Sequence, residues 1–257
     1  MIWALWRAGE TLVELPVASR PRTALEGYAV QAQLPIVAGR EVVGWKIAAT
    51  SLAGQAHIRV SGPLAGRLLS GQVFGDGATL SLAGNRMRVV EPEFCFRMAC
   101  DLPPRAKPYS RQEVMAAVGA LHLALEAPDS RFAVFEQAGE AQLIADNACT
   151  GQFVLGPEAP MLWRDLHLSR HAVTAHVVTA QGDSWTREGI GENVLGDPSV
   201  ALAWLANCLS GLGLTLAADQ IVTTGACMKP LEIHPGDSVS ADYGALGRVN
   251  LRLDTVA

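Results

Sequence analysis

The segment Glu91-Pro92-Glu93 places two carboxylates two residues apart inside an otherwise apolar run at 89–96. Side chains alternate between the two faces of a β-strand, so both glutamates are expected on one face and Pro92 on the other. Two like charges side by side in a half-buried sheet repel each other and lose hydration. The pattern therefore favours a bound cation, and a hard ion with oxygen ligands, such as Mg²⁺ or Mn²⁺, fits it best.

Ordinary charge pairing is the alternative for these two glutamates. One of them could point to solvent, or each could pair with a basic neighbour: Arg86, Arg88 or Arg97. Pro92 indicates a sheet edge, a strand start or a bulge, because proline cannot donate a hydrogen bond to a β-ladder. Such places often border functional sites. The residues alone leave metal binding and charge pairing both open.

The composition limits the class of protein. The chain has 257 residues, 49% hydrophobic and 18% charged, which is enough to bury a large core. A formal charge of -5 without basic runs gives no support for nucleic-acid binding, so a small-molecule substrate is expected. Five cysteines without a Cys-x-x-Cys pair predict neither a zinc site nor a disulfide framework. Their odd number and the lack of a signal-peptide pattern predict a cytoplasmic protein.

An uncharged run at 198–218 is about as long as a membrane span, roughly twenty residues. Asp197 followed by Pro198 is typical of a helix N-cap and first turn, and Gly211 or Gly213 offers a C-terminal cap. The run therefore predicts a buried helix over about 198–210 in place of a membrane span.

The order of the patterns along the chain predicts an α+β fold. Helical periodicity at 2–9 and 23–34 comes first. A capping box formed by Ser110 and Glu113 starts a helix that is expected to run to about residue 123. Strands are expected at 41–48, 71–82, 87–98, 141–155, 171–178, 220–224, 238–243 and 248–253. The helical N-terminal part is expected to pack onto this β-rich body.

Lys46 lies in a strand that is expected to be largely buried on both faces. Burial disfavours the ammonium form and lowers the pKa of a lysine, which suits proton transfer near neutral pH. The alternative is a lysine at a sheet edge whose ammonium group reaches the solvent.

Glu126 ends the apolar stretch 121–125, either just after a helix or on the strand that leaves it. A carboxylate near a helix C-terminus needs a compensating partner. Glu126 is either a third metal ligand or the partner of Arg131. The polar segment 146–151 predicts a tight turn that faces a ligand, and a plain Asx turn is the alternative.

The motifs that carry a family resemblance follow one another along nearly the whole chain. They are Gly-Tyr-Ala-Val-Gln at 27–31, Gly-Trp-Lys-Ile at 44–47, Thr-Ser at 50–51, Val-Glu-Pro-Glu at 90–93, Leu-Glu at 125–126, Asp-Ser-Arg at 129–131, Ala-Asp-Asn-Ala at 145–148, Leu-Gly-Asp-Pro at 195–198, Trp-Leu-Ala-Asn at 204–207 and Pro-Gly-Asp at 235–237. In this order and spacing the chain resembles the fumarylacetoacetate hydrolase superfamily, in its branch of 2-keto-4-pentenoate hydratases and 4-oxalocrotonate decarboxylases.

The resemblance implies a mixed β-sandwich roll with a smaller helical N-terminal region. We expect the helical region over residues 1–60, leading into the first strand, and the β-roll catalytic domain over 61–257. The resemblance also implies Mg²⁺ or Mn²⁺ held by Glu91, Glu93 and Glu126, with Lys46 as the general acid/base. A homo-oligomer is expected, and association with a decarboxylase or hydratase partner is the alternative.

The activity that the resemblance implies is that of a metal-dependent lyase on a 2-oxo or 2-hydroxydienoic acid from aromatic catabolism. Hydration to a 4-hydroxy-2-oxo acid is the preferred reaction. The alternatives are a 4-oxalocrotonate-type decarboxylase, an acylpyruvate-type or fumarylacetoacetate-type C–C hydrolase, and a catalytically weakened partner subunit. Candidate substrate contacts are Thr50, His57, Asn147 and Cys149.

Two positions depart from the family pattern. Hydratases of this branch usually carry a Pro-Asp-Phe-Gly-like segment after the lysine strand, and here Leu64 stands in place of its aspartate. His57 or an ordered water is then expected to take over the acid/base work of that aspartate. Cys149 stands where a serine commonly follows Asp-Asn-Ala, which keeps the size but weakens the hydrogen bond. We expect the substrate to differ accordingly.

Overall fold

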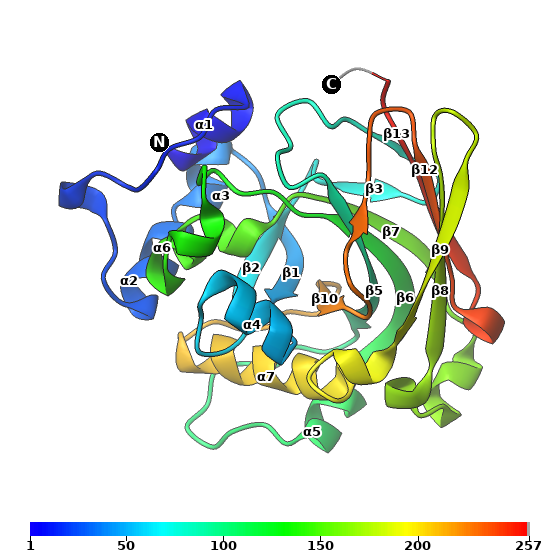
Figure 1. The fold of residues 1–257 in the computed structure, drawn as a ribbon. Coiled ribbons are helices and arrows are strands. Elements are labelled where there is room, and N and C mark those ends of the chain that lie inside the picture. The colour runs from blue at the N-terminus through cyan, green and yellow to red at the C-terminus, as the bar shows by residue number, and fades with distance from the viewer. Residues whose placement is uncertain (256–257) are drawn as a thin grey trace.

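Two β-sheets form the body of the protein in the computed structural model, which describes residues 1–255 (Figure 1). The larger sheet contains β1 (Val42–Ala48), β2 (Leu64–Leu69), β3 (Val73–Gly75), β5 (Val89–Met98), β6 (Val118–Ala127), β7 (Gln152–Glu158), β10 (Ile221–Ala226) and β11 (Leu231–Glu232). The smaller sheet contains β4 (Thr79–Leu80), β8 (Ala172–Val178), β9 (Ser184–Ile190), β12 (Ser238–Asp242) and β13 (Arg248–Leu253). The α+β class predicted from the sequence is therefore confirmed.

The larger sheet is mixed and strongly curled (Figure 1). Its strand order is β2-β1-β10-β5-β6-β7-β3, and β11 pairs with β5. The pairs β1–β10 and β3–β7 are parallel, and the other pairs are antiparallel. The smaller sheet has the order β4-β13-β12-β8-β9.

The two faces of the larger sheet pack against different groups of residues. On β5, Phe94 and Phe96 point outward into the main hydrophobic core, which they share with residues of the smaller sheet. Cys95 and its neighbours Ala124 and Phe153 form a small apolar cluster on the inner face of the curl. This alternation follows from the two-residue period of a strand, so the side chains of Glu91 and Glu93 lie on the inner face.

The helices cover the sheets from several sides (Figure 1). They are α1 (Ile2–Ala8), α2 (Ala24–Gln31), α3 (Leu34–Ala38), α4 (Leu52–Ile58), α5 (Arg111–Ala116), α6 (Glu140–Ala145) and α7 (Pro198–Gly211). Short 3₁₀ segments lie at Val17–Ser19, Phe135–Gln137, Met161–Asp165, Leu168–Arg170, Gly191–Asn193 and Gly244–Leu246, and a left-handed turn lies at Asn147–Cys149. In Figure 1, α1, α2, α3 and α6 gather on one side of the larger sheet and the smaller sheet lies on the other.

Helix α7 confirms the prediction made for the uncharged run. The Asp197 side chain accepts a hydrogen bond from the backbone N–H of Ser199 at 2.8 Å, and Pro198 occupies the first helical position. The apolar face of the helix, with Leu202 and Leu205, packs into the main core. Within residues 1–255, α7 and the other helices are too short or too polar to cross a membrane.

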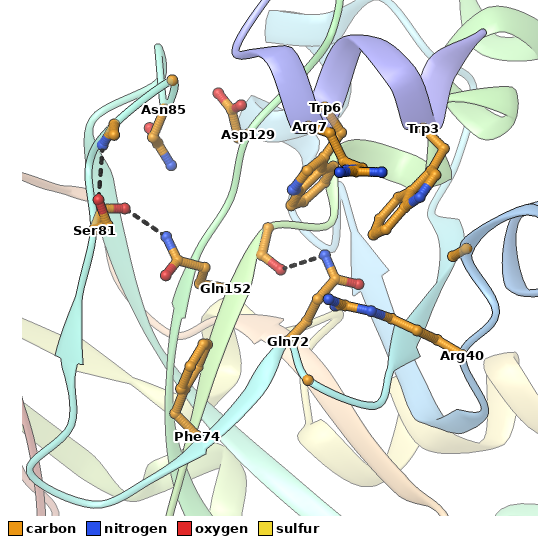
Figure 2. A pocket seen from close by; sticks show the side chains of 15 residues that line it. Trp3, Trp6, Arg7, Arg40, Gln72, Phe74, Ser81, Asn85, Asp129 and Gln152 are labelled. Carbon is orange, nitrogen blue, oxygen red and sulfur yellow. Dashed lines mark hydrogen bonds between the residues drawn. The ribbon is translucent and has the colours of Figure 1, made fainter.

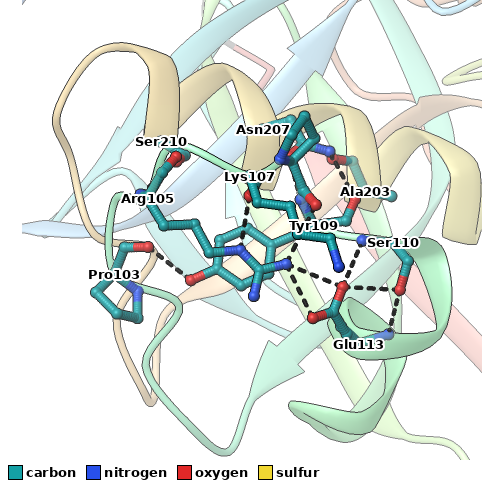
Figure 3. Close-up of polar contacts among 10 residues, drawn as sticks. Pro103, Arg105, Lys107, Tyr109, Ser110, Glu113, Ala203, Asn207 and Ser210 are labelled. Carbon is teal, nitrogen blue, oxygen red and sulfur yellow. Dashed lines mark hydrogen bonds and ion pairs between the residues drawn. The ribbon is translucent and has the colours of Figure 1, made fainter.

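A polar network ties the segment that joins β5 to α5 onto α7 (Figure 3). The Arg105 guanidinium lies 3.6 Å from the ring centre of Tyr109 and donates to both carboxylate oxygens of Glu113 at 2.9 Å. Asn207 of α7 accepts from the backbone N–H of Tyr109 and donates to its carbonyl. Ser110 and Glu113 form the predicted capping box. This network holds the segment that connects the two strands carrying the glutamates.

Three predicted elements differ from the structure. The helix that starts at Ser110 ends at Ala116, and the apolar stretch after it is β6. A strand buried on both faces has no polar alternation, so its sequence resembles a buried helix. The predicted strand 141–155 is the helix α6, a turn, and then β7. Within the predicted strand 71–82, only β3 and β4 are strands. The elements α3, α4, β2, β9 and β11 were not predicted.

The N-terminal helices share a second hydrophobic core with α6. Its buried residues include Leu15, Ile58, Phe132 and Ile144. The Gln31 side chain of α2 donates to the backbone carbonyls of Ala65 and Ile144, which joins α2 to β2 and α6. Strand β1 lies inside the larger sheet, so the N-terminal part is continuous with the body. The division of the chain at residue 60 stays a prediction.

Candidate active site

Three glutamates meet on the inner face of the larger sheet. Antiparallel pairing sets Glu91 of β5 directly opposite Glu126 of β6, and Glu93 opposite Ala124. Carboxylate oxygens of Glu91, Glu93 and Glu126 lie within 4.8 Å of one another. Within residues 1–255 none of the arginines at 86, 88 and 97 forms an ion pair with them. The strand register therefore groups the three carboxylates that were predicted to bind a metal.

Glu93 is fixed by donors from β10. Its Oε2 atom accepts hydrogen bonds from the Thr223 hydroxyl and from the backbone N–H of Gly225, the latter at 2.7 Å. Gly225 has φ +99°, and a Cβ there would lie 2.1 Å from Oγ1 of Thr50. Glycine is therefore required at 225 both for the backbone conformation and for the close approach. Thr50, a predicted substrate contact, therefore packs against Gly225, whose backbone N–H donates to Glu93.

Glu126 has the least favourable environment of the three. Its side chain is 0% exposed, and within residues 1–255 neither carboxylate oxygen accepts a hydrogen bond. Nζ of Lys46 lies 3.3 Å from Oε2 and forms an ion pair without good hydrogen-bond geometry. A buried carboxylate is costly unless it is paired and hydrogen-bonded or coordinates a metal. A cation bound between the carboxylates would satisfy these two oxygens.

Lys46 is 3% exposed, as predicted for a strand buried on both faces. Its Nζ atom also donates to the carbonyl of Ala148 at 3.2 Å. The predicted lowering of its pKa is wrong. Burial does lower the pKa, but Glu126, Glu91 and Glu93 together raise it above its ordinary value. The lysine is therefore held as an ammonium ion by the carboxylates around it.

The carboxyl groups respond to the same burial in the opposite sense. Burial raises the pKa of Glu91 to about 7, although Lys46 opposes the shift and Glu126 adds to it. Burial is also the main cause that raises the pKa values of Glu93 and Glu126. Three carboxylates and one ammonium group would carry two net negative charges. That charge, and a donor set made only of carboxylate oxygens, fit a hard divalent cation such as Mg²⁺ or Mn²⁺.

A left-handed turn presents the Ala148 carbonyl to Lys46. Asn147, Ala148 and Cys149 have φ values of 60°, 52° and 58°, a conformation that is strained for residues other than glycine. The Asn147 side chain holds the turn, because it accepts from the N–H of Arg67 at 2.7 Å and donates to the Arg67 carbonyl at 2.8 Å. The sequence predicted a tight turn at 146–151, but its left-handed backbone was not predicted.

Arg131 does not neutralise Glu126, so that alternative is wrong. The Arg131 Nε atom donates to Asp146 at 2.9 Å, and the same carboxylate accepts from the backbone N–H of Arg131 and the hydroxyl of Ser130. Asp129 lies 3.7 Å from the guanidinium. These contacts anchor the start of the left-handed turn and leave Glu126 to Lys46.

The other predicted substrate contacts are placed as follows. Both polar atoms of the Asn147 amide are occupied by the Arg67 backbone. Cys149 is buried, and burial raises the pKa of its thiol to about 12, so the thiol is neutral. His57 is exposed on α4 and lies 4.0 Å from Glu136 and 5.8 Å from the ring of Phe135. Within residues 1–255 it has no ion pair with Glu91, Glu93 or Glu126. Their roles toward a substrate stay predictions.

Leu64, in place of the family aspartate, begins β2 and is buried in the second core.

Sequence reasoning did not find Thr223 and Gly225, which complete the surroundings of Glu93. Thr223 lies in a correctly predicted strand, but its role depends on the pairing of β10 with β5. Strand order, which a single sequence does not state, was the missing signal.

Comparisons with known proteins show which proteins the chain resembles. The chain is 33% identical over 233 residues to a 2-keto-4-pentenoate hydratase of Paraburkholderia xenovorans, covering 90% of this chain and 84% of that protein. It is 29% identical over 241 residues to the 2-oxo-hept-4-ene-1,7-dioate hydratase of Escherichia coli, covering 88% and 85%. No family model matches the chain.

A solved structure of 4-oxalocrotonate decarboxylase from Pseudomonas putida G7, complexed with magnesium and adipate, superimposes with a TM-score of 0.86. The match has 25% identity and covers 98% of this chain and 94% of that one. The chain belongs to the fumarylacetoacetate hydrolase superfamily, in its branch of 2-keto-4-pentenoate hydratases and 4-oxalocrotonate decarboxylases. The resemblance read from the motifs is confirmed.

Proposed function

We propose that the protein is a metal-dependent hydro-lyase that converts a 2-hydroxydienoic acid into a 4-hydroxy-2-oxo acid. The observation that carries the proposal is the buried Glu126 carboxylate, which lacks hydrogen bonds and lies beside Glu91, Glu93 and the ammonium group of Lys46. The curated relatives named as hydratases support the choice of reaction.

Glu91, Glu93 and Glu126 would hold the ion, with Mg²⁺ or Mn²⁺ as the candidates. Such an ion supplies Lewis acidity toward the carboxylate and 2-oxo oxygens of a bound 2-oxo acid. Thr223 and the N–H of Gly225 fix Glu93, so this ligand needs little reorganisation. Glu91 is half-buried, which leaves an approach to the carboxylates from that side.

Lys46 would move the proton. Two acceptors, Glu126 and the Ala148 carbonyl, hold its ammonium group in place on the inner face. Ketonisation of a dienol requires a proton at the far carbon of the diene, and an ammonium group can donate it as a general acid. Water then adds to the resulting double bond and gives the 4-hydroxy-2-oxo acid. The 2-hydroxyl group loses its proton to solvent during ketonisation. During hydration the deprotonated lysine can take a proton from the attacking water, and the carbon beside the 2-oxo group receives a proton from solvent.

Decarboxylation of a 4-oxalocrotonate-type diacid is the second candidate. The structural match to the decarboxylase over 98% of this chain favours it, as does Leu64 in place of the hydratase aspartate. Incubation of the protein and Mg²⁺ or Mn²⁺ with 2-hydroxypenta-2,4-dienoate, and in parallel with the diacid, separates the two. Formation of the 4-hydroxy-2-oxo acid supports hydration, and release of CO₂ from the diacid alone supports decarboxylation.

We also infer that the curled sheets form the β-sandwich roll of the superfamily, with residues 1–60 as its helical region. The helices α1–α3 and the continuous larger sheet support this division. A homo-oligomer in the cytoplasm is proposed by analogy with the family. Light scattering on the purified protein tests the oligomer: a mass above that of one 27.2 kDa chain is expected.

A further inference from the structure

A cavity of about 600 Å³ lies beside α1 (Figure 2). Its walls are α1, the residues before β1, the segment 81–85 and the start of β7. Neither the glutamates nor Lys46 line it. Ligand sites typically have volumes of roughly 300 to 1,000 Å³, so this cavity can hold a small molecule.

The charged groups of the cavity leave an excess of positive charge. Arg7 and Arg40 reach toward the same space in Figure 2, and within residues 1–255 neither forms an ion pair. Asp129 is the acidic residue of the lining, and its carboxylate is already engaged by the backbone N–H of Arg86 at 2.8 Å and by Arg131 at 3.7 Å. Two guanidinium groups without an ion pair favour a carboxylate.

Gln72 adds a requirement for a hydrogen-bond donor. Its side chain is 4% exposed and donates through Nε2 to the carbonyl of Gly151, whereas Oε1 is buried without a partner. A buried acceptor that is left unsatisfied destabilises a protein by roughly 1 to 3 kcal/mol. Figure 2 shows this amide beside the Arg40 guanidinium. A ligand that carries a hydroxyl group next to its anionic group would satisfy both.

Aromatic side chains give the cavity flat walls. The rings of Trp3 and Trp6 are stacked at 6.4 Å, and the Arg40 guanidinium lies 5.2 Å from the ring of Trp3. Phe74 lines the opposite side. Tryptophan and phenylalanine faces bind planar rings, with offset or edge contacts.

The frame of the cavity is fixed by short contacts. Gly9, after α1, touches Gly84, where a Cβ would lie 2.9 Å from the Gly9 Cα atom. The Gln152 side chain donates to the Ser81 carbonyl at 2.7 Å. These contacts connect α1, the segment 81–85 and β7, so the cavity does not depend on a loop that must close.

We propose that this cavity binds a small hydroxylated aromatic carboxylate. Arg7 and Arg40 receive the carboxylate, the indoles of Trp3 and Trp6 contact the ring, and Oε1 of Gln72 accepts a hydrogen bond from the hydroxyl group. The site is separate from the proposed metal centre and does not depend on the reaction proposed there.

Isothermal titration calorimetry of the metal-free protein with salicylate tests the proposal, because chelation by a metal then contributes nothing. Saturable binding at one site per chain is expected, with benzoate weaker because it lacks the hydroxyl group. Arg40→Ala should weaken salicylate binding about tenfold or more, as expected for loss of a charge-assisted hydrogen bond. The matched control is Arg22→Ala, which removes an exposed arginine outside the cavity and should leave binding unchanged. Gln72→Leu should bring salicylate down to the affinity of benzoate.

Three results would overturn the proposal. One is the absence of saturable binding. Another is an equal loss of salicylate affinity in the Arg40→Ala and Arg22→Ala proteins, which would indicate a general charge effect. The third is binding that is lost in Glu91→Gln and retained in Arg40→Ala, which would place salicylate at the glutamates. Retained binding in Glu91→Gln supports the separate site.

Discussion

Glu91 of β5 lies directly opposite Glu126 of β6, so two carboxylates face each other across antiparallel strands on the inner face of the curled sheet. Like charges in this position destabilise a sheet. Glu93 adds a third carboxylate, and Lys46 offsets only part of the charge. A cation that binds between the carboxylates would explain why the fold keeps this cluster buried.

Removal of one ligand should abolish stabilisation by metal. Mg²⁺ at about one hundred times its dissociation constant should stabilise the wild-type protein by about 2.7 kcal/mol, because the ion binds only the folded chain. The Glu91→Gln protein should gain little from the same addition. Thermal unfolding with Mg²⁺ and with EDTA measures the difference. Glu188→Gln, an exposed glutamate on β9, is the control and should respond like the wild type. An equal gain in the Glu91→Gln protein would remove this residue from the ligand set.

Lys46→Met should separate catalysis from metal binding. It removes the proton donor but leaves the three carboxylates, so kcat should fall by about 10² to 10⁴. The affinity for Mg²⁺ should not fall, since a positive charge beside the ligands is lost. Steady-state kinetics and a metal titration measure the two effects. Lys107→Met changes an exposed lysine and should alter neither. A normal kcat in Lys46→Met would exclude this lysine as the acid/base.

Gly225→Ala should disturb the support of Glu93. The added Cβ meets Oγ1 of Thr50 and requires a φ of +99°, so we expect destabilisation by at least about 1 kcal/mol and weaker metal binding. Chemical denaturation and a metal titration test both effects. Gly62→Ala is the matched control, because no atom lies within 4 Å of its added Cβ and its φ is not positive. Equal effects in the two variants would contradict a specific role for Gly225.

Acid should weaken the capping box at the start of α5. The hydrogen bonds that Glu113 accepts from Ser110, together with Arg105, lower its pKa from the ordinary 4.5 to about 2. A carboxyl group with a lowered pKa contributes stability above its unfolded pKa and loses it as the pH falls toward the folded value. Between pH 4.5 and 2 the wild type should therefore lose more stability than Glu113→Gln. Urea midpoints across this range check the prediction, and parallel curves for the two proteins would contradict it.

Part of the proposed metal site could be predicted from local patterns, whereas the full set of three ligands followed only from the family resemblance. The two-residue period placed Glu91 and Glu93 on one face, and the apolar surroundings of Lys46 indicated burial. Glu126 was left between two interpretations, since its position depends on the pairing of β6 with β5. The net effect of the carboxylates on the pKa of Lys46 likewise depends on distances between strands.

The elements that were not predicted have sequences without a distinctive period. Strand β6 is buried on both faces, so it looks like the continuation of α5. The left-handed turn at Asn147–Cys149 contains no glycine, and its conformation is imposed by the side chain of Asn147 and the backbone of Arg67. The cavity beside α1 is formed by segments far apart in the chain, which periodicity does not relate.

The central claim is that Glu91, Glu93 and Glu126 hold a divalent cation, and anomalous diffraction from crystals soaked in Mn²⁺ tests it most directly. The account predicts one strong anomalous peak in contact with carboxylate oxygens of all three residues, which disappears in crystals of Glu91→Gln. Strong Mn²⁺ peaks elsewhere, with none between the three carboxylates, would contradict it.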